Sequence, residues 1–203
     1  LPLLPKERHT MLFSATMPSS IAELSRKMLY KPTRVEVAPA SSVVDTIKQS
    51  LFMIEKPEKS KLLLNLLKKE GIKSTLVFSR TKHGADKIAK ILNKNGILCD
   101  AIHGNKSQNA RQRALTNFKT GKTHVIIATD IAARGIDIDN LQLVINYDLP
   151  DVAETYVHRI GRTGRAGHNG SAITFCSTDE RVMLRDIQKL TGKKLNVVAQ
   201  QSA

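Results

Sequence analysis

The sequence predicts an α/β fold in which helices cover both faces of a mostly parallel sheet. From residue 47 onward, short apolar runs alternate with segments of helical periodicity, and this alternation is typical of parallel strands joined by crossover helices. The run His124-Val-Ile-Ile-Ala128 is almost wholly apolar, as expected for a strand that is covered on both sides.

The individual strands and helices are predicted from the apolar runs and from the residues that begin and end them. We expect strands at residues 47–54, 75–78, 97–102, 124–128, 143–147 and 171–176. We expect helices at residues 57–69, 82–95, 107–119, 152–160 and 180–190. Gly96 follows the helix at 82–95 directly, and Gly121 closes the helix at 107–119 two residues after its end, where glycine commonly ends a helix. In such folds, ligands gather at the carboxyl ends of the strands.

A separate pattern precedes this region. Residues 9–16 form an apolar run, a helical pattern follows Pro18, and residues 33–37 alternate like a short strand. The stretch 39–46 has the composition of a linker, so we place a domain boundary there. The main domain then spans residues 47–192, and residues 193–203 have the character of a tail. We expect residues 1–38 to dock on this domain or on a neighbouring copy, because their apolar faces suit a sheet.

Composition favours a polyanionic partner. The 203 residues include 32 Lys and Arg against 18 Asp and Glu, a formal net charge of +14. No apolar run approaches the roughly 18 residues that a membrane span requires, and no signal peptide is visible, so nucleic acid is the better candidate. With three Tyr, five Phe and no Trp, the chain has few platforms for stacking bases. We therefore expect contacts to the backbone, with little sequence preference.

The two cysteines predict no metal site. Cys99 and Cys176 lie far apart in apolar runs, without CxxC spacing or nearby histidine ligands. They are interpreted as reduced core thiols of an intracellular protein, and we expect a cytoplasmic location.

The stretch Tyr156-Val-His-Arg-Ile-Gly-Arg-Thr-Gly-Arg-Ala-Gly167 concentrates cations and glycines. Arg162 and Arg165 are three residues apart, so both guanidinium groups can point the same way. Two such groups suit the γ-phosphate of a nucleotide, whereas a solvated basic helix end is the simpler alternative. Without this context, His158 would be interpreted as a histidine on an amphipathic helix whose hydrogen bonds are satisfied.

This stretch resembles motif VI of superfamily 2 helicases, in the form His-Arg-Ile-Gly-Arg-Thr-Gly-Arg that is typical of DEAD-box RNA helicases. The resemblance implies a RecA-like three-layer fold and makes Arg162 and Arg165 arginine fingers that contact ATP. It also places His158 near the attacking water, in an organising role.

The stretch Ala128-Thr-Asp-Ile-Ala-Ala-Arg-Gly-Ile-Asp137 follows the most apolar strand and resembles motif V. On this resemblance Thr129 contacts an RNA phosphate, while Gly135 and Asp137 lie beside the nucleotide. The role of Arg134 is left open. A structural Arg–Asp pair is the alternative interpretation.

Leu76-Val-Phe-Ser-Arg-Thr-Lys82 runs from a strand into a helix N-terminus, where free N–H groups attract phosphate. Ser79, Arg80 and Thr81 could add side-chain donors, although Thr81 could equally be a plain N-cap. The stretch looks like motif IV, which implies that these three residues contact the RNA backbone.

Ile102-His-Gly-Asn-Lys-Ser-Gln-Asn-Ala-Arg111 again joins a strand to a helix. Gly104 permits close backbone approach, and Gln108 and Arg111 share one helical face. By itself this is a helix start with a surface arginine. The stretch resembles the Gln-x-x-Arg motif IVa, which implies contacts to RNA phosphates.

Two further segments extend the resemblance. Ser14-Ala-Thr16 looks like motif III, so residues 1–38 would be the remnant of a first RecA-like domain. The segments Arg-Thr-Lys-His-Gly-Ala, Ala-Ile-His-Gly-Asn-Lys-Ser-Gln and Met-Leu-Arg-Asp-Ile-Gln look like the bacterial RhlE-like subfamily.

Neither a phosphate loop nor an Asp-Glu-Ala-Asp sequence occurs in the chain. Gly121-Lys-Thr123 is not a phosphate loop, because Thr116 stands where its first glycine should be. The resemblance therefore implies that ATP and Mg²⁺ are held by the first RecA-like domain of the intact enzyme, and that this chain alone hydrolyses no ATP. A non-catalytic RNA-binding module and half of a DNA helicase are the alternatives.

Overall fold

The computed structural model describes residues 4–5, 7–14, 17, 19–36, 47–68, 74–134, 136, 138, 141–164 and 170–198. The chain divides into two units, residues 1–40 and 41–203, and each unit is described by itself below.

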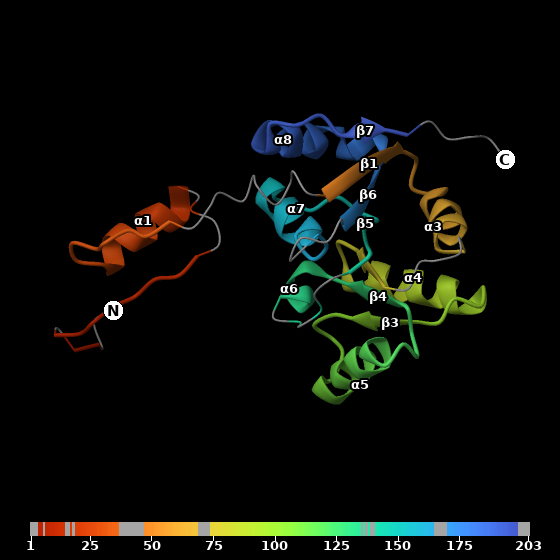
Figure 1. Ribbon diagram of the computed structural model, residues 1–203, viewed down its shortest axis with the longest axis horizontal. Coiled ribbons are helices and arrows are strands. Elements are labelled where there is room, and N and C mark those ends of the chain that lie inside the picture. The colour runs from red at the N-terminus through yellow and green to blue at the C-terminus, as the bar shows by residue number, and fades with distance from the viewer. Residues whose placement is uncertain are drawn as a thin grey trace. The chain divides into compact units, whose positions relative to one another are not determined.

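The larger unit is built on a seven-stranded sheet in which every strand pairing is parallel. The strand order is β3-β4-β2-β5-β6-β1-β7 (Figure 1). Their bounds are β1 Ile47–Met53, β2 Thr75–Phe78, β3 Cys99–Ile102, β4 Val125–Ala128, β5 Leu143–Asn146, β6 Gly170–Cys176 and β7 Asn196–Val197. Three neighbouring strands, β4, β2 and β5, are buried along their whole length, because helices cover both faces of the sheet.

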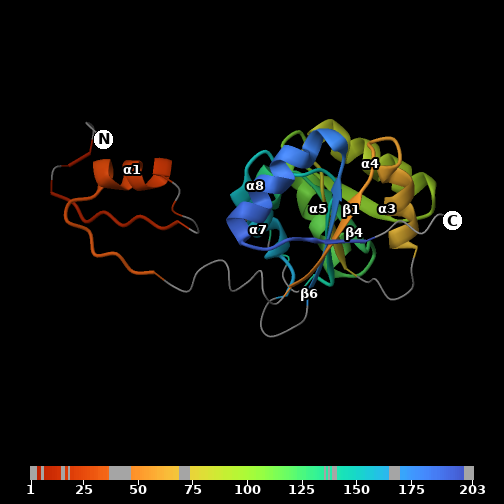
Figure 2. The same cartoon turned by 90° about the horizontal axis from the view of Figure 1, so that it is seen from above.

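The helices form two layers (Figure 2). One face of the sheet packs against α3 (Lys59–Leu67) and α4 (Lys82–Lys94), around core residues such as Leu63 and Leu92. The opposite face packs against α5 (Gln108–Lys119), α6 (Asp130–Ala133), α7 (Ala153–Ile160) and α8 (Arg181–Thr191). A 3-10 turn, η1 (Thr178–Glu180), leads into α8. The predicted three-layer RecA-like fold is therefore confirmed.

Most predicted elements lie within one or two residues of the observed ones, and Gly96 and Gly121 have the positive φ expected after a helix. Three of the described elements were not predicted, one of them the 3-10 turn η1. The four-residue helix α6 follows β4 within the motif V stretch. Residues 196–197, which were expected to belong to a tail, instead form β7 beside β1, where Val198 N donates to Leu51 O at 2.8 Å.

In the smaller unit, only the helix prediction is confirmed, as α1 (Ser19–Met28). The strand predictions are wrong for their described parts, residues 9–14 and 33–36, which carry no strand. The physical reason is that an extended segment needs a hydrogen-bonded neighbour to be a strand, and the apolar alternation does not supply one. Phe13 and Val35 are 87% and 83% exposed.

Both cysteines are free and buried, as predicted. Burial raises the pKa of the Cys99 thiol to about 12 and that of the Cys176 thiol to about 11. The described residues contain no helix long and apolar enough to cross a membrane. They also contain no cluster of three or more His, Cys, Asp or Glu that could hold a metal ion.

Candidate functional site

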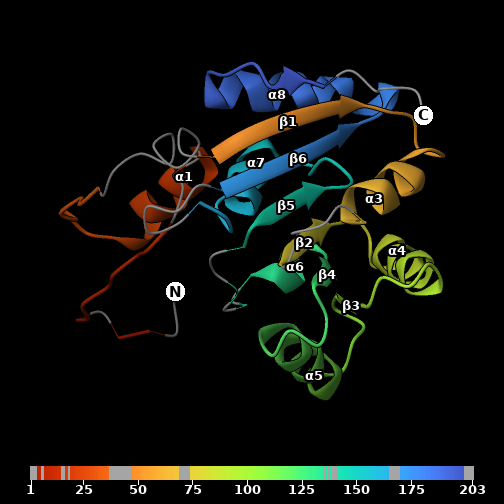
Figure 3. The same cartoon turned by 45° about the vertical axis from the view of Figure 1, so that its right-hand side comes forward.

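The candidate site lies at the carboxyl edge of the parallel sheet. Because all strands run the same way, the segments that follow β2, β4 and β5 meet at this edge (Figure 3). They carry Ser79 to Thr81, Thr129 with Asp130, and Tyr147 with Asp148, respectively. Helix α7 then supplies His158 and Arg159 of the motif VI stretch, and the turn that follows it carries Arg162.

Arg159 anchors α7 to the start of α6. Its side chain is only 1% exposed, and its Nε and Nη2 donate to the two carboxylate oxygens of Asp130 at 2.6 and 2.8 Å. Nη1 donates to the carbonyl of Asp148 at 2.6 Å and to Asn146 Oδ1 at 3.2 Å. The guanidinium also lies 4.9 Å from the centre of the Phe78 ring.

These contacts give Arg159 a structural role. A buried guanidinium is tolerated because its charge is paired and its donors are satisfied. Asp130 of the motif V stretch pairs with Arg159 of the motif VI stretch, and not with an arginine of its own stretch. Sequence reasoning counted Arg159 only as one more cation, and the signal that it missed is the pattern of α7, where Tyr156, Arg159 and Ile160 share the buried face.

His158 lies in a small pocket of about 20 Å³, on the side of α7 that faces α6. That volume holds about one water molecule. The pocket is lined by Phe78, Asp130, Ala133, Arg134, Thr155, His158, Arg159 and Arg162. His158 Nε2 is buried and has no hydrogen-bond partner in the described part of the chain.

The pKa of His158 is lowered from its ordinary value. Burial is the main cause, the charges of Arg134 and Arg162 add to it, and Glu154 opposes it. His158 is therefore a neutral imidazole at pH 7, able to donate one hydrogen bond and accept another. An imidazole in this state can orient a water or a partner side chain; the organising role that the resemblance implies for His158 stays a prediction.

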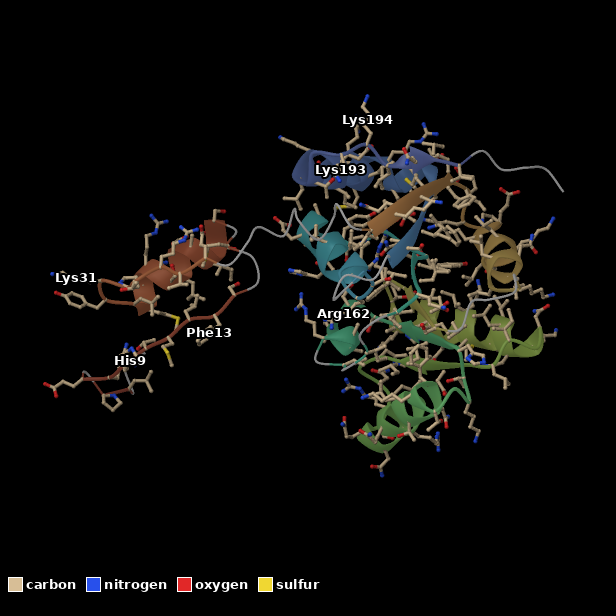
Figure 4. The ribbon with its side chains drawn as sticks, viewed as in Figure 1. His9, Phe13, Lys31, Arg162, Lys193 and Lys194 are labelled. Atoms are coloured by element: carbon tan, nitrogen blue, oxygen red, sulfur yellow. The ribbon has the colours of Figure 1, made fainter. Side chains whose placement is uncertain are left out.

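Arg162, labelled in Figure 4, lies in the turn that follows α7. The turn is fixed against the chain before β5: Leu141 N donates to Arg162 O at 3.4 Å, and Thr163 Oγ1 donates to Leu141 O. Gly170 packs so closely on this turn that an added Cβ would lie 2.7 Å from Gly164 Cα. Arg162 thus projects from a tightly held backbone and lines the same pocket as His158.

Three of the predicted nucleotide-site residues, Gly135, Asp137 and Arg165, lie outside the described residues. The convergence of Arg165 with Arg162 therefore stays a prediction.

The motif IV residues are held within a dense polar network. Ser79 is fully buried, and its Oγ donates to Asp148 Oδ2 at 3.2 Å. Thr81 is the N-cap of α4 and accepts a hydrogen bond from Gly84 N at 2.9 Å, so the capping interpretation is confirmed. Arg80 Nη2 donates to Glu180 Oε1 at 2.6 Å, and its Nε donates to Leu149 O at 3.1 Å. The Arg80 side chain is still 35% exposed, so these partners hold the guanidinium in place while part of it faces solvent.

Glu180 is the centre of this network. Its carboxylate accepts hydrogen bonds from Lys59 Nζ at 2.7 Å, from Leu149 N at 3.0 Å, and from both N and Oγ of Ser177 at 3.1 and 2.9 Å, in addition to Arg80. Burial acts to raise the pKa of Glu180, but Lys59 and the backbone donors outweigh it and hold the pKa below its ordinary value. Sequence reasoning missed Lys59 and Glu180, because nothing local marks a residue whose partner is distant in the chain.

The remaining predicted RNA contacts lie on neighbouring loops. Gly104 and Gln108 are exposed, and the space around an added Cβ at Gly104 is open within 4 Å. Arg111 Nη2 donates to Ala132 O at 3.4 Å, which brings α5 against α6. Thr129 is the N-cap residue of α6 but makes no side-chain cap hydrogen bond, so its hydroxyl is left for another partner.

Comparison with known proteins agrees with this architecture. Residues 58–167 match the helicase conserved C-terminal domain family. The ATP-dependent RNA helicase DbpA of Bacillus subtilis is 43% identical over 195 residues, which are 96% of this chain and 41% of that protein. The chain thus spans about two fifths of the length of the curated relatives that it matches.

Solved structures show the same fold. The C-terminal domain of the DEAD-box protein Dbp5 superposes with a TM-score of 0.70 at 35% identity, over 76% of this chain and 91% of that one. Dbp5 of S. cerevisiae bound to RNA and ADP BeF3 gives a TM-score of 0.86 at 34% identity, over 97% of this chain and 53% of that one. The all-parallel sheet between two helical layers defines a RecA-like domain. The chain belongs to the helicase conserved C-terminal domain family, as the C-terminal domain of a DEAD-box protein.

Proposed function

We propose that the chain acts within an ATP-dependent RNA helicase, where it supplies the arginine fingers and part of the RNA-backbone track. The observation that carries this proposal is the pocket shared by His158, Arg134 and Arg162, at the edge of the sheet where RecA-like folds hold their ligands. DbpA, named above as an ATP-dependent RNA helicase, and the Dbp5 structure with RNA support it.

In this proposal the nucleotide is held between two RecA-like domains. The other domain binds ATP and Mg²⁺, and the metal supplies charge neutralisation of the phosphates. The cations of the pocket here suit the phosphate oxygens and not the metal. Arg162, together with Arg165, stabilises the charge that gathers on the γ-phosphoryl group during transfer. Gly135 and Asp137 lie beside the nucleotide, and neutral His158 orients the groups around the attacking water.

The RNA strand would cross the loops after β2, β3 and β4. Phosphate and sugar would be contacted by exposed Gly104 and Gln108, by Arg111, and by Thr129, whose hydroxyl makes no cap hydrogen bond. Thr81, Ser79 and Arg80 form the neighbouring part of this track. Closure of the two domains would bend the strand and separate a local duplex, and hydrolysis would release it. Assignment to the bacterial RhlE-like subfamily and a cytoplasmic location belong to the same proposal.

The decisive experiment is RNA-stimulated ATP hydrolysis, measured for this chain alone and after the upstream RecA-like domain is restored. We expect no hydrolysis by the chain alone and activity for the two domains together. Arg162→Ala in the two-domain protein should reduce the rate by about a thousandfold or more, while exposed Arg113→Ala should leave it unchanged.

Other outcomes would select an alternative. Equal salt-dependent RNA affinity with and without the upstream domain, and no hydrolysis in either case, would indicate a non-catalytic RNA-binding module. Stimulation by DNA as strong as by RNA would indicate half of a DNA helicase, because contacts to the 2′-hydroxyl distinguish the two.

A further inference from the structure

The outer face of α4 carries a row of three lysines and one histidine. Its members are exposed and lie four, three and four residues apart. With 3.6 residues per turn they fall within an arc of about 60°, directly opposite buried Leu92. This row, called the α4 row below, consists of His83, Lys87, Lys90 and Lys94.

The α4 row has no acidic counterpart within the described residues. Asp86, the one acidic residue of α4, lies beside the row and pairs with Lys106 Nζ at 2.9 Å. Burial acts to raise the pKa of Asp86, but contacts with His103 and Lys106 lower it, so this carboxylate is charged and already compensated. None of the three lysines takes part in an ion pair among the residues that the structure describes. Solvated helix faces usually mix the two signs, whereas this face presents only one.

A pocket opens at the N-terminal end of the α4 row, between α3 and α4, which lie next to each other in Figure 3. Its volume is about 250 Å³, and Lys87 belongs to both the row and the pocket wall. The wall also carries the hydrogen-bonded hydroxyls of Ser60 and Tyr147, whose oxygens are 2.8 Å apart, together with Asp148 and with Lys56, which pairs with Asp179 at 2.7 Å. Lys87 and the paired hydroxyls suit a phosphate and its ribose.

The α4 row is continuous with the proposed RNA track. Thr81, at the end of that track, caps the N-terminus of α4, and His83 and Lys87 follow within the next two turns. From His83 to Lys94 the row extends for about 16 Å along the helix axis. The RNA-facing loops and this row therefore form one basic path that turns around the edge of the sheet.

We propose that RNA flanking the strand held by the motif loops leaves that track at Thr81, passes the pocket between α3 and α4, and follows the α4 row. Lys87, Lys90 and Lys94 contact its phosphates. The inference rests on the proposed RNA-binding function and adds a second, sequence-independent subsite to it. The ligand of the α4 row is the sugar–phosphate backbone of single-stranded RNA. Its bases are not bound there, because the row offers charge and no aromatic side chain for stacking.

The test uses the two-domain protein and fluorescence anisotropy with oligouridylates. A short oligomer is compared with the same oligomer extended by single-stranded nucleotides at its 5′ or its 3′ end. The variant K87E/K90E/K94E is compared with R181E/R185E/K189E, which reverses three exposed cations on α8, in the other helical layer. Both variants change the net charge equally, and both must retain the thermal unfolding midpoint of the unmodified protein.

We expect one of the two extensions to tighten binding to the unmodified protein. The α4 variant should lose this gain while binding the short oligomer normally, and its slope of log affinity against log salt should fall by about 2, for three single-strand phosphates. The α8 variant should keep both. The inference is overturned if neither extension adds affinity, or if the two variants lose the gain equally. Failure of the unmodified protein to bind any RNA would instead remove the proposed function, and this inference with it.

Discussion

Lys59 and Glu180 are 121 positions apart in the sequence, yet Lys59 Nζ donates to Glu180 Oε2 at 2.7 Å inside the domain. Their side chains are 1% and 3% exposed. Lys59 also donates to the carbonyl of Tyr147 at 2.8 Å. The pair thereby links the first turn of α3, the end of β5 and the turn before α8, next to the motif IV residues.

Removing the lysine of this pair should destabilise the domain strongly. Lys59→Ala leaves the buried Glu180 carboxylate with one cation fewer, and breaking such a pair costs about 3–5 kcal/mol. Urea unfolding at pH 7 measures the change. Lys61→Ala, on the exposed side of the same helix, should stay within about 0.5 kcal/mol. Equal stability of the two variants would show that the pair contributes little to folding.

The same network should make stability fall in acid. The pKa of Glu180 is lowered in the folded state, so the folded state binds its proton less readily than the unfolded chain does. The stabilisation is complete above the ordinary carboxyl pKa of about 4.3. It is lost as the pH falls from there through the lower folded value.

Urea midpoints between pH 7 and pH 3 test this pH dependence. Glu180→Gln should lower stability at pH 7 and flatten the decline below about pH 4.3. Asp186→Asn, on the exposed surface of α8, serves as a control for removal of one carboxylate and should leave the decline unchanged. An unaltered decline in Glu180→Gln would assign the acid sensitivity to other groups.

His158 should titrate below the ordinary range for histidine. Its lowered pKa follows first from burial and then from Arg134 and Arg162. NMR titration of the imidazole resonances should therefore show a midpoint below about 6.5. Arg134→Gln should raise that midpoint, because it removes a positive charge that disfavours protonation. No upward shift would exclude Arg134 as a cause.

Replacing Gly170 or Gly104 by alanine tests how closely the backbone packs at each position, with Gly104 as the control. Gly170→Ala should cost about 1–3 kcal/mol through overpacking, because its Cβ would press on Thr163 and Gly164. In the two-domain protein it should also lower ATPase activity, since it displaces the turn that carries Arg162. Gly104→Ala meets open space and should leave stability within about 0.5 kcal/mol. Similar losses of stability in both variants would contradict this account of the turn.

The elements of the larger unit could be predicted well from the sequence, because apolar runs and helix-ending glycines are both local signals. The apolar run at β4 and the glycines after α4 and α5 report on burial and backbone geometry at their own positions. The same reasoning failed for residues 9–14 and 33–36, because a strand is defined by its neighbour. It failed for β7 for the converse reason: two exposed residues become a strand only because β1 lies beside them.

The candidate site shows the same division. The sequence of motif VI was enough to single out His158 and Arg162, which line one pocket. The cap at Thr81 could be predicted from its residue type alone. The motif sequence could not show that Arg159 and Arg162 differ in role. Arg159 is buried against Asp130, whereas Arg162, three positions later, lines the pocket. That difference depends on which face of α7 meets the sheet, and on an aspartate 29 positions earlier.

The strand order has a consequence for synthesis of the chain on the ribosome. β1 is made first among the seven strands, but it pairs only with β6 and β7, the last two. At about 5–20 residues per second, roughly 6–25 s separate the completion of β1 at residue 53 from that of β6 at residue 176. Throughout that interval Leu51, buried in the finished core, has no neighbouring strand to pair with. The domain therefore completes its sheet only when its C-terminal strands have emerged, and until then the apolar residues of its first strand are without their final partners.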